Sequence, residues 1–520
     1  MTLALAALLL ASAVIFALPL GRRPLDSQDE ARYSLLAREA VEHGHWILPR
    51  VRDEIYLNKP PLFFWTVAVF ALPFGKVTDA NAPIASVISA LMGLLAVFAI
   101  GRLLWGAAVA LAAVLVLATS PFYFFMAHQV LTDMMLTAWM AWALYFYLAS
   151  VRAPSAWRPL LGFYLCAAGA LASKGPAALV VLVAAMAASL VTEGFPGIKR
   201  LRLLLGLGLI VLTALPWFLP YLLQREKSYG QAVVMTDYVG WYFRSTVVSR
   251  LEAMAQHLTR FLPWGFFLLP AVWWWTRDRG SDRTRLLVWA GTLIVLLSLS
   301  GEQRARYFLP LWPVLSLLVA EFFVRGAERA RSLLDWAAAI YLLLMIGAGA
   351  FVIWGSVSGA DVVFLPASTL ERWLTATAIV VGAALALLSL RVEHSGLAAT
   401  AWLAAGLGVT LTVAALGYPA RFARAHDYPG VALRVGPMLT QGQPLFAYPD
   451  ASLAWDFYLR RPVRELRSEG EAVMLLAAAP RVRVLMRIDE WQRLKPQADA
   501  GWRALDEGQV GRRQFVLLGG

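Results

Sequence analysis

The sequence predicts an all-α polytopic membrane protein with a small α/β domain at its C-terminal end. Hydrophobic residues make up 60% of the 520 residues, charged residues only 15%, and the mean hydropathy is +0.63. In an average soluble domain, about a quarter of the residues are charged. Apolar runs fill the chain up to about residue 416, and charged residues become frequent after it. The two parts therefore call for different folds.

The membrane part contains thirteen predicted crossings of a hydrocarbon layer about 30 Å thick. Residues 3–20 resemble a signal-peptide core, but they lack a charged start, which favours an uncleaved first span. The apolar run of residues 61–74 is short and is bounded by Pro and Gly, so we interpret it as a juxtamembrane helix. The predicted spans are residues 3–20, 82–101, 106–121, 130–150, 159–173, 175–192, 201–222, 258–276, 286–300, 308–324, 332–355, 371–390 and 396–416.

The basic residues predict the orientation. The formal charge of +13 does not indicate nucleic-acid binding here, because Lys and Arg gather in short loops between apolar runs. By the positive-inside rule those loops and the N-terminus are cytoplasmic. High Ala, Leu and Arg usage is typical of a GC-rich bacterium, whose inner membrane we expect the chain to cross. The loops at 21–81 and 223–257 and everything from 417 onward are then periplasmic. The basic loop residues are Arg152, Arg158, Lys199, Arg200, Arg202, Arg277, Arg279, Arg283, Arg285, Arg325, Arg329 and Arg331.

The C-terminal residues 417–520 predict a periplasmic α/β domain, whereas residues 1–416 predict the transmembrane catalytic domain. Residues 444–448 and 482–486 alternate as strands do, and residues 490–494 are amphipathic. The single cysteine, Cys166, lies within an apolar run, so no disulfide can form within one chain.

The first predicted periplasmic loop carries an unusual acidic segment, Ser27-Gln28-Asp29-Glu30-Ala31-Arg32-Tyr33. Charged groups beside a bilayer are costly to bury, so such a cluster indicates a functional site. Asp29 is the candidate catalytic carboxylate, and Glu30, Arg32 and Tyr33 are candidate substrate-binding residues. Two structural alternatives remain: the carboxylates cap a helix that begins near Ala31, and Arg32 forms a local ion pair with Asp29.

Further polar residues fall at the ends of spans that are predicted to face outward. Lys59 lies between Asn58 and two prolines, in a rigid turn that suits phosphate binding, although a snorkelling lysine is the alternative. Asp133 interrupts an apolar run, which favours a functional role and makes it the second candidate catalytic residue. Arg306 and Tyr307 precede an apolar span and suit an anionic head group. The remaining candidates are His257 and Lys174, the latter equally well explained as an ordinary turn residue.

The sequence lacks the motifs of several common classes of enzyme. The sequence has no Walker A loop, dinucleotide-binding glycine pattern or nucleophile elbow. The histidines are scattered and define no metal motif, but a divalent metal ion held by carboxylates remains an option. No cofactor is specified.

Taken together, the motifs resemble those of PMT-type lipid-linked-sugar transferases, in particular the branch that modifies lipid A with aminoarabinose. They are Ser27 to Tyr33, Asn58-Lys59-Pro60-Pro61, Leu131-Thr132-Asp133, Ser173-Lys174-Gly175 and Arg306-Tyr307-Phe308-Leu309-Pro310. Their order and spacing carry the resemblance over nearly the whole chain.

The resemblance implies a GT-C fold and a polyprenyl-phosphate sugar donor, expected to be undecaprenyl phosphate carrying 4-amino-4-deoxy-L-arabinose. It implies lipid A or another glycolipid as acceptor, within membrane lipid. By the same resemblance Asp29 is the first-loop acid, with Arg32 and Tyr33 as its partners. Lys59 and Tyr307 contact the donor phosphate, and Asp133 is the second acid. Relatives in the lipid A branch have Glu where this chain has Asn58, which leaves the acceptor open.

The expected reaction is a single inverting displacement. Because the leaving phosphate is anionic, Lys59, Arg306 and Tyr307 would stabilise charge that grows in the transition state. Asp29 would act as general base toward a hydroxyl acceptor, or would orient a phosphate acceptor. The alternatives are transfer of another sugar to a protein or glycan hydroxyl, and a non-enzymatic lipid or polysaccharide exporter.

Overall fold

The computed structural model consists mainly of helices. It describes residues 2–519 apart from 26, 53, 57, 224–253, 255, 278, 279, 300–303, 327–330, 359–367, 392–395, 441, 479, 480 and 512. The predicted loop 223–257 therefore lies almost wholly outside the described residues. The chain forms two compact units, the first of residues 1–18, 57–63 and 83–417 and the second of residues 19–56, 64–82 and 418–520.

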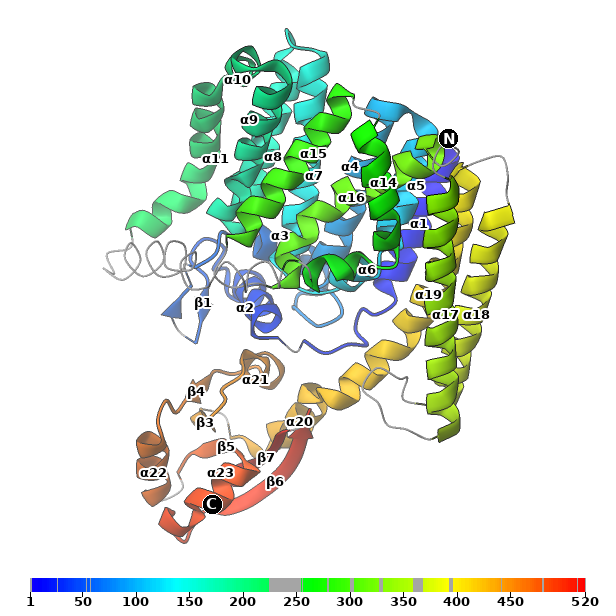
Figure 1. Cartoon of the computed structure of the whole chain (residues 1–520). Helices are drawn as coiled ribbons and strands as arrows, with labels where there is room; N and C mark the ends of the chain where they lie inside the picture. The colour runs from blue at the N-terminus through cyan, green and yellow to red at the C-terminus, as the bar shows by residue number, and fades with distance from the viewer. Residues whose placement is uncertain are drawn as a thin grey trace. The chain divides into compact units, whose positions relative to one another are not determined.

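The first unit is a helical assembly in which α7, α8, α9 and α15 lie side by side (Figure 1). Leucine, alanine and valine dominate these helices, and their buried faces form the core. The helices are α1 (Thr2–Ala17), α4 (Ile84–Trp105), α5 (Ala107–Ala118), α6 (Pro121–Ala127), α7 (Thr132–Arg152), α8 (Trp157–Lys174), α9 (Val180–Glu193), α10 (Phe195–Arg200), α11 (Leu203–Leu223), α14 (Leu268–Arg277), α15 (Ser281–Ser298), α16 (Trp312–Glu321), α17 (Arg331–Ser358), α18 (Thr369–Arg391) and α19 (Gly396–Ala425). α3 (Leu62–Ala71) and the end of α19 pass into the second unit.

Six helical segments among the described residues are long and apolar enough to cross a membrane. A seventh results if α5 and α6, which are bent by 69° at their junction, count as one span. Each of the thirteen predicted spans contains a helix, but the number of crossings remains a prediction. The run 61–74 forms a short apolar helix, Leu62–Phe74.

The stretch 258–276 differs from its predicted single span. It begins with two 3-10 turns, Thr259–Phe261 and Trp264–Phe267, and only the ten residues of α14 are α-helical. Pro263 lies between the two turns and has no amide hydrogen for a helical hydrogen bond. The stretch is therefore as apolar as a membrane span but does not form one continuous helix.

Close contacts between helices depend on small residues. A side chain at Gly101 of α4 would approach the Ala110 backbone of α5 to 2.8 Å. Gly382 of α18 and Gly406 of α19 face each other in the same way. A Cβ atom added at Gly382 would lie 2.9 Å from the Gly406 carbonyl oxygen. Small residues of this kind let helix backbones approach in membrane proteins.

Two arginines from a predicted basic loop lie inside the first unit. Arg283 forms a bidentate ion pair with Glu321, which is fully buried, at 2.7 Å. Arg285 pairs with Glu193 at 3.0 Å and with Asp282 at 3.5 Å. These two arginines join α15 to α16 and α9, in addition to any role in orientation.

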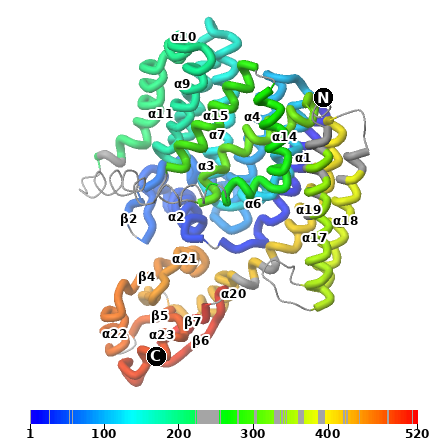
Figure 2. The backbone as a smooth tube through the Cα atoms, viewed as in Figure 1, coloured from blue at the N-terminus to red at the C-terminus, as the bar shows by residue number. Residues whose placement is uncertain are grey.

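The second unit contains a five-stranded mixed sheet in the order β4-β3-β5-β7-β6. The first three strands pair in parallel, whereas β5-β7 and β7-β6 are antiparallel. Figure 2 shows the backbone of this C-terminal region, with β4, β5, β6 and β7 labelled. The predicted strands and the amphipathic stretch correspond to β3, β5 and α23. The elements are α2 (Gln28–His43), β1 (Arg50–Val51), β2 (Glu54–Ile55), α20 (Tyr428–Val435), β3 (Leu445–Tyr448), α21 (Leu453–Leu459), β4 (Val463–Glu465), α22 (Glu469–Ala477), β5 (Arg483–Arg487), α23 (Ile488–Leu494), β6 (Arg503–Val510) and β7 (Arg513–Gly519).

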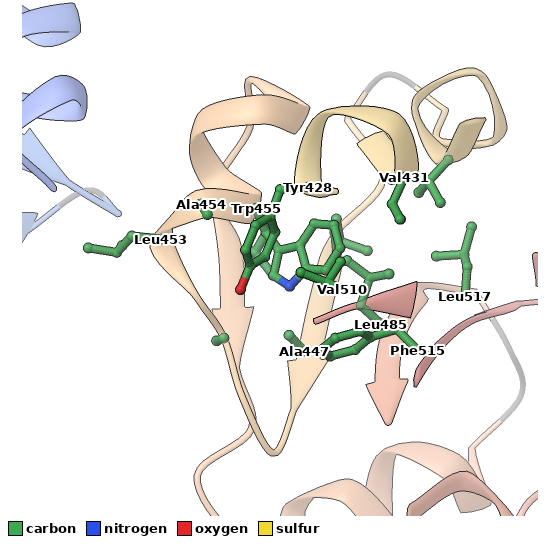
Figure 3. Close-up of a cluster of buried hydrophobic side chains, with 14 of the residues drawn as sticks. Tyr428, Val431, Ala447, Leu453, Ala454, Trp455, Leu485, Val510, Phe515 and Leu517 are labelled. Atoms are coloured by element: carbon green, nitrogen blue, oxygen red, sulfur yellow. The ribbon is translucent and has the colours of Figure 1, made fainter. Parts of the chain in front are cut away.

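Alternate residues of the sheet enter two cores. Leu485 and Leu517 join one hydrophobic cluster, in which Trp455 contacts Phe515 edge to face (Figure 3). Val484 and Val516, their neighbours in the chain, join the other cluster. This period of two shows that both faces of the sheet are covered.

Candidate active site

Five of the predicted site residues come together in the first unit, and we call them the basic cluster: Lys59, Asp133, Lys174, Arg306 and Tyr307. Asp133 lies in the first turn of α7, and Lys174 is the last residue of α8. Because α7 and α8 form an antiparallel hairpin, these two positions meet at the same end of the pair. A carboxylate at a helix N-terminus and an ammonium at a helix C-terminus also suit the two helix dipoles.

Asp133 is the centre of the contacts in the basic cluster. Lys174 donates a short hydrogen bond to Asp133 Oδ1, and Arg306 Nε lies 3.6 Å from Asp133 Oδ2. Asp133 is only 2% exposed. A buried carboxylate with one partner is expensive, and two cationic partners offset its desolvation. Its ion pairs make Asp133 a group that orients cations.

The aromatic ring and the third cation complete the arrangement. Lys174 Nζ lies 4.3 Å from the centroid of the Tyr307 ring, and the Arg306 guanidinium lies 5.8 Å from it. The charges of Arg306 and Lys59 both act on Lys174. Positive charges in the basic cluster therefore outnumber negative ones by three to one. Such a set of donors is suited to a phosphate group.

His257 lies beside the same segment. It is 9% exposed, and its ring centroid is 5.4 Å from that of Phe308, the residue after Tyr307. Arg306, Tyr307 and Phe308 share one 3-10 helix, Ala305–Leu311. The structure thus brings His257 to the predicted donor segment, with its ring packed on an aromatic neighbour.

The acidic segment of the first loop forms the start of α2, in the second unit. Ser27 is the N-cap: its hydroxyl accepts a hydrogen bond from the Glu30 amide at 3.1 Å. Asp29 and Arg32 form the expected local ion pair, at 2.6 Å, and both remain partly exposed. Tyr33 is buried at 4% exposure. The capping alternative thus holds in modified form, because the helix begins three residues before Ala31 and Ser27 provides the cap.

Glu30 has a partner that the sequence reasoning missed. Arg23 donates to both carboxylate oxygens of Glu30, at 3.1 and 2.7 Å, and both side chains are buried. The Arg23 guanidinium also lies 4.9 Å from the Phe422 ring centroid. Arg23 precedes α2 and is not three or four residues from Glu30, the spacing of contacting helix neighbours, so only its place between two apolar segments could have singled it out.

A metal site is not defined by the described part of the chain. Within it, no three His, Cys, Asp or Glu side chains come together in a way that could hold a metal ion. The contacts of Asp133 are instead with cations. The chemistry that the basic cluster supports is binding of an anion.

Comparisons with known proteins agree with the motifs. Residues 58–223 match the dolichyl-phosphate-mannose-protein mannosyltransferase family. An undecaprenyl phosphate-alpha-4-amino-4-deoxy-L-arabinose arabinosyl transferase of Serratia proteamaculans is 29% identical over 335 residues, 60% of this chain and 57% of the relative. The same-named protein of Pectobacterium atrosepticum is 28% identical over 378 residues, 68% and 63% of the two chains. The matched region thus spans about three fifths of these relatives.

Solved structures share the fold over the full length. The crystal structure of ArnT from Cupriavidus metallidurans in the apo state has a TM-score of 0.78 and 24% identity, covering 99% of this chain and 97% of that one. The structure of the same protein bound to undecaprenyl phosphate has a TM-score of 0.76 and 22% identity, covering 98% and 97%. These matches show that this chain has the fold of those structures.

Proposed function

We propose that this chain, which is similar to the PMT-type lipid-linked-sugar transferases, is a membrane glycosyltransferase that uses an undecaprenyl phosphate sugar. The sugar is 4-amino-4-deoxy-L-arabinose and the acceptor is a lipid A phosphate. Two findings support this: the names of the curated relatives, and a solved structure of the same fold that holds undecaprenyl phosphate. The reaction takes place at the periplasmic face of the inner membrane, with the N-terminus in the cytoplasm.

The single observation that carries the proposal is the basic cluster. Breaking the bond between sugar and phosphate leaves negative charge on the polyprenyl phosphate. Lys59, Arg306 and Tyr307 supply two cations and a phenol to that charge, and Lys174 supplies a third cation. Asp133 holds Lys174 and Arg306 in place through its ion pairs. Donors fixed in advance stabilise a transition state without reorganisation when the reaction occurs.

Asp29 is the proposed catalytic residue of the first loop, and Glu30, Arg32, Tyr33 and His257 are proposed to bind substrate. A lipid A phosphate is already ionised as a nucleophile, so Asp29 then orients the acceptor or stabilises positive charge on the sugar ring. Inversion occurs in one displacement and needs no covalent enzyme intermediate.

Purified protein incubated with undecaprenyl-phosphate aminoarabinose and lipid A tests the proposal. Mass spectrometry is expected to detect lipid A that carries one added aminoarabinose. Asp29→Ala is expected to abolish transfer while undecaprenyl phosphate still binds. Donor binding without any sugar transfer by the unmodified protein would contradict the proposal.

A second acceptor class has a specific observation in its favour. The matched family is described as transferring mannose to protein, and Asn58 departs from the Glu of the lipid A branch. With a protein or glycan hydroxyl as acceptor, Asp29 would serve as general base. Lipid A from cells with and without the gene separates the two cases, because an unchanged lipid A profile excludes the first acceptor and leaves the second.

A further inference from the structure

The helix that carries Asp29 is attached to the C-terminal part of the chain along one face. Gln28 Oε1 accepts a hydrogen bond from the Leu453 amide at 3.0 Å. Ala31 and Leu35 pack into the hydrophobic cluster formed mainly by C-terminal residues. Successive spacings of three or four residues place all attached positions on one side of α2. These positions are Gln28, Ala31, Leu35, Arg38 and Glu42.

Arg38 is a buried polar residue among these attachments. Its Nη2 donates to the carbonyl oxygen of Phe457 at 2.9 Å, and its guanidinium lies 4.3 Å from the Phe457 ring centroid. Phe457 lies in the last turn of α21, where carbonyl groups lack partners within the helix. Arg38 therefore supplies both a hydrogen bond and a positive charge to the C-terminal end of α21. The side chain is buried, and burial lowers the pKa of Arg38 to about 10.

A second arginine fixes the segment after α2 to the same short helix. Arg52 donates to both carboxylate oxygens of Asp456, at 2.9 and 2.7 Å, and to the Ala451 carbonyl oxygen at 2.6 Å. Asp456 Oδ1 also accepts from the Val463 amide at 3.1 Å, at the start of β4. The attachment of α2 thus continues through α21 into the sheet, which is a rigid support.

The opposite side of α2 carries the residues proposed to meet substrate. At about 100° per residue, Asp29 and Tyr33 lie on the side of the helix away from Ala31, Leu35 and Arg38. Any rotation of α2 about its axis would move the Asp29 carboxylate. Each contact with α21 therefore restricts the direction in which Asp29 points.

We propose that α21 sets the orientation of Asp29 for the reaction, and that Arg38 is a positioning residue. This inference rests on the proposed function. A misplacement of about 1 Å at a reacting group can lower a rate about 100-fold while leaving remote binding contacts intact. The C-terminal residues of the second unit then contribute to turnover through α2.

Arg38→Met and Arg38→Lys test the inference, with Arg493→Met as matched control. Arg493 is an arginine of the same unit, but it is exposed, and its ion-pair partners among the described residues are Glu490 and Glu469. Arg38→Met is expected to lower kcat roughly 10- to 100-fold and to change undecaprenyl phosphate affinity less than twofold. Arg38→Lys is expected to recover part of kcat, because an ammonium still donates to a carbonyl, and Arg493→Met to retain full kcat.

Two results overturn the inference: an unchanged kcat in Arg38→Met, or a parallel loss of kcat and donor affinity. If Arg38→Met does not fold, Gln28→Ala replaces it. That variant removes the hydrogen bond to Leu453, and kcat is expected to fall roughly 2- to 10-fold. A kcat equal to that of the unmodified protein counts against the inference.

Hydrogen exchange in α2 separates this inference from the proposed function. If the unmodified protein does not modify lipid A, the proposed function fails. The attachment is still tested, because Arg38→Met must then accelerate amide exchange in α2 several-fold relative to Arg493→Met. Equal exchange in the two variants would reject the role of Arg38, whatever the acceptor.

Discussion

The Asp133 carboxylate looks isolated in the sequence but is paired with two cations in the structure. In the sequence it is a lone carboxylate in an apolar run, whereas in the structure it joins Lys174 to Arg306. Its negative charge keeps two like charges close together in a buried place. Its proposed role follows from that: Asp133 prepares the cations that meet the donor phosphate.

Asp133→Asn keeps the shape of the side chain and removes its charge. The variant is expected to lower sugar transfer at least about 100-fold, equivalent to about 3 kcal/mol of transition-state stabilisation, because two buried cations lose their counter-charge. Transfer from the undecaprenyl donor measures the effect. Asp282→Asn, which removes a partly exposed partner of Arg152 and Arg285, is the control and is expected to stay within about threefold. Equal activity of the two variants would contradict the assignment.

Lys59→Met tests contact with the donor phosphate. Hydrogen bonds to charged groups contribute about 1.5 to 3 kcal/mol, so affinity for undecaprenyl phosphate is expected to fall about 10- to 100-fold. Binding of undecaprenyl phosphate to the purified variant measures the loss. Lys199→Met, at an exposed lysine of α10, is the matched control and should bind normally. An affinity unchanged by Lys59→Met would favour the snorkelling alternative.

Ion pairs could be predicted from the sequence where the two partners are close along the chain. Asp29 and Arg32 are three residues apart, so their ion pair follows from helical spacing. The Asp133–Lys174 pair spans 41 residues and the Arg283–Glu321 pair 38, so each requires the packing of two helices. From sequence alone, Lys174 is therefore equally well explained as a turn residue. Arg283 is predicted only as a loop charge, since nothing local indicates its buried partner.

At the scale of elements, apolar runs predict helices well and their continuity less well. The strands of the C-terminal part follow from alternation, and β3 and β5 begin within one residue of the predicted segments. The run 258–276 is not the continuous helix that its apolar composition predicts, because Pro263 interrupts helical hydrogen bonding and hydropathy does not account for that. The division into units could not be predicted either. It joins residues 19–56 to residues 418–520, and only tertiary packing creates that link.

The contact between α4 and α5 gives a prediction at this scale. Gly101→Ala is expected to lower the stability of the purified protein by about 1 to 3 kcal/mol, since the new methyl group meets the Ala110 backbone. Gly291→Ala in α15 is the control, because its added carbon meets nothing within 4 Å and a helix favours Ala over Gly. Thermal unfolding in detergent compares the two. A melting temperature unchanged by Gly101→Ala would contradict the close approach.

At the scale of the whole molecule, buried carboxylates of the second unit influence how stability depends on pH. Burial raises the pKa of Asp79 despite a 3.3 Å hydrogen bond from the Tyr458 hydroxyl, and burial likewise raises the pKa of Asp456 despite its pairing with Arg52. A raised carboxyl pKa means that the folded state binds the proton more tightly than the unfolded state. The free energy of unfolding then decreases as pH rises from the unfolded pKa through the folded one.

Asp79→Asn removes the charge at every pH. The variant is expected to melt at a higher temperature than the unmodified protein at pH 7, and at nearly the same temperature where Asp79 is protonated, below about pH 3. Asp489→Asn gives the opposite sign, because Arg487 lowers the pKa of the exposed Asp489 and that stabilisation is lost as pH falls. Melting curves across this range measure both. A lower melting temperature of Asp79→Asn at pH 7 would contradict the direction.

The pairing of Arg52 with Asp456 joins positions 404 residues apart. A ribosome adds about 5 to 20 residues per second, so about 20 to 80 s separate the synthesis of the two partners. During that interval α21 does not yet exist to hold the helix bearing Asp29. The apolar face of that helix therefore stays uncovered by its partners and accessible to lipid, chaperones and proteases. The first acidic loop is thus among the earliest parts of the protein to be made and among the last to mature.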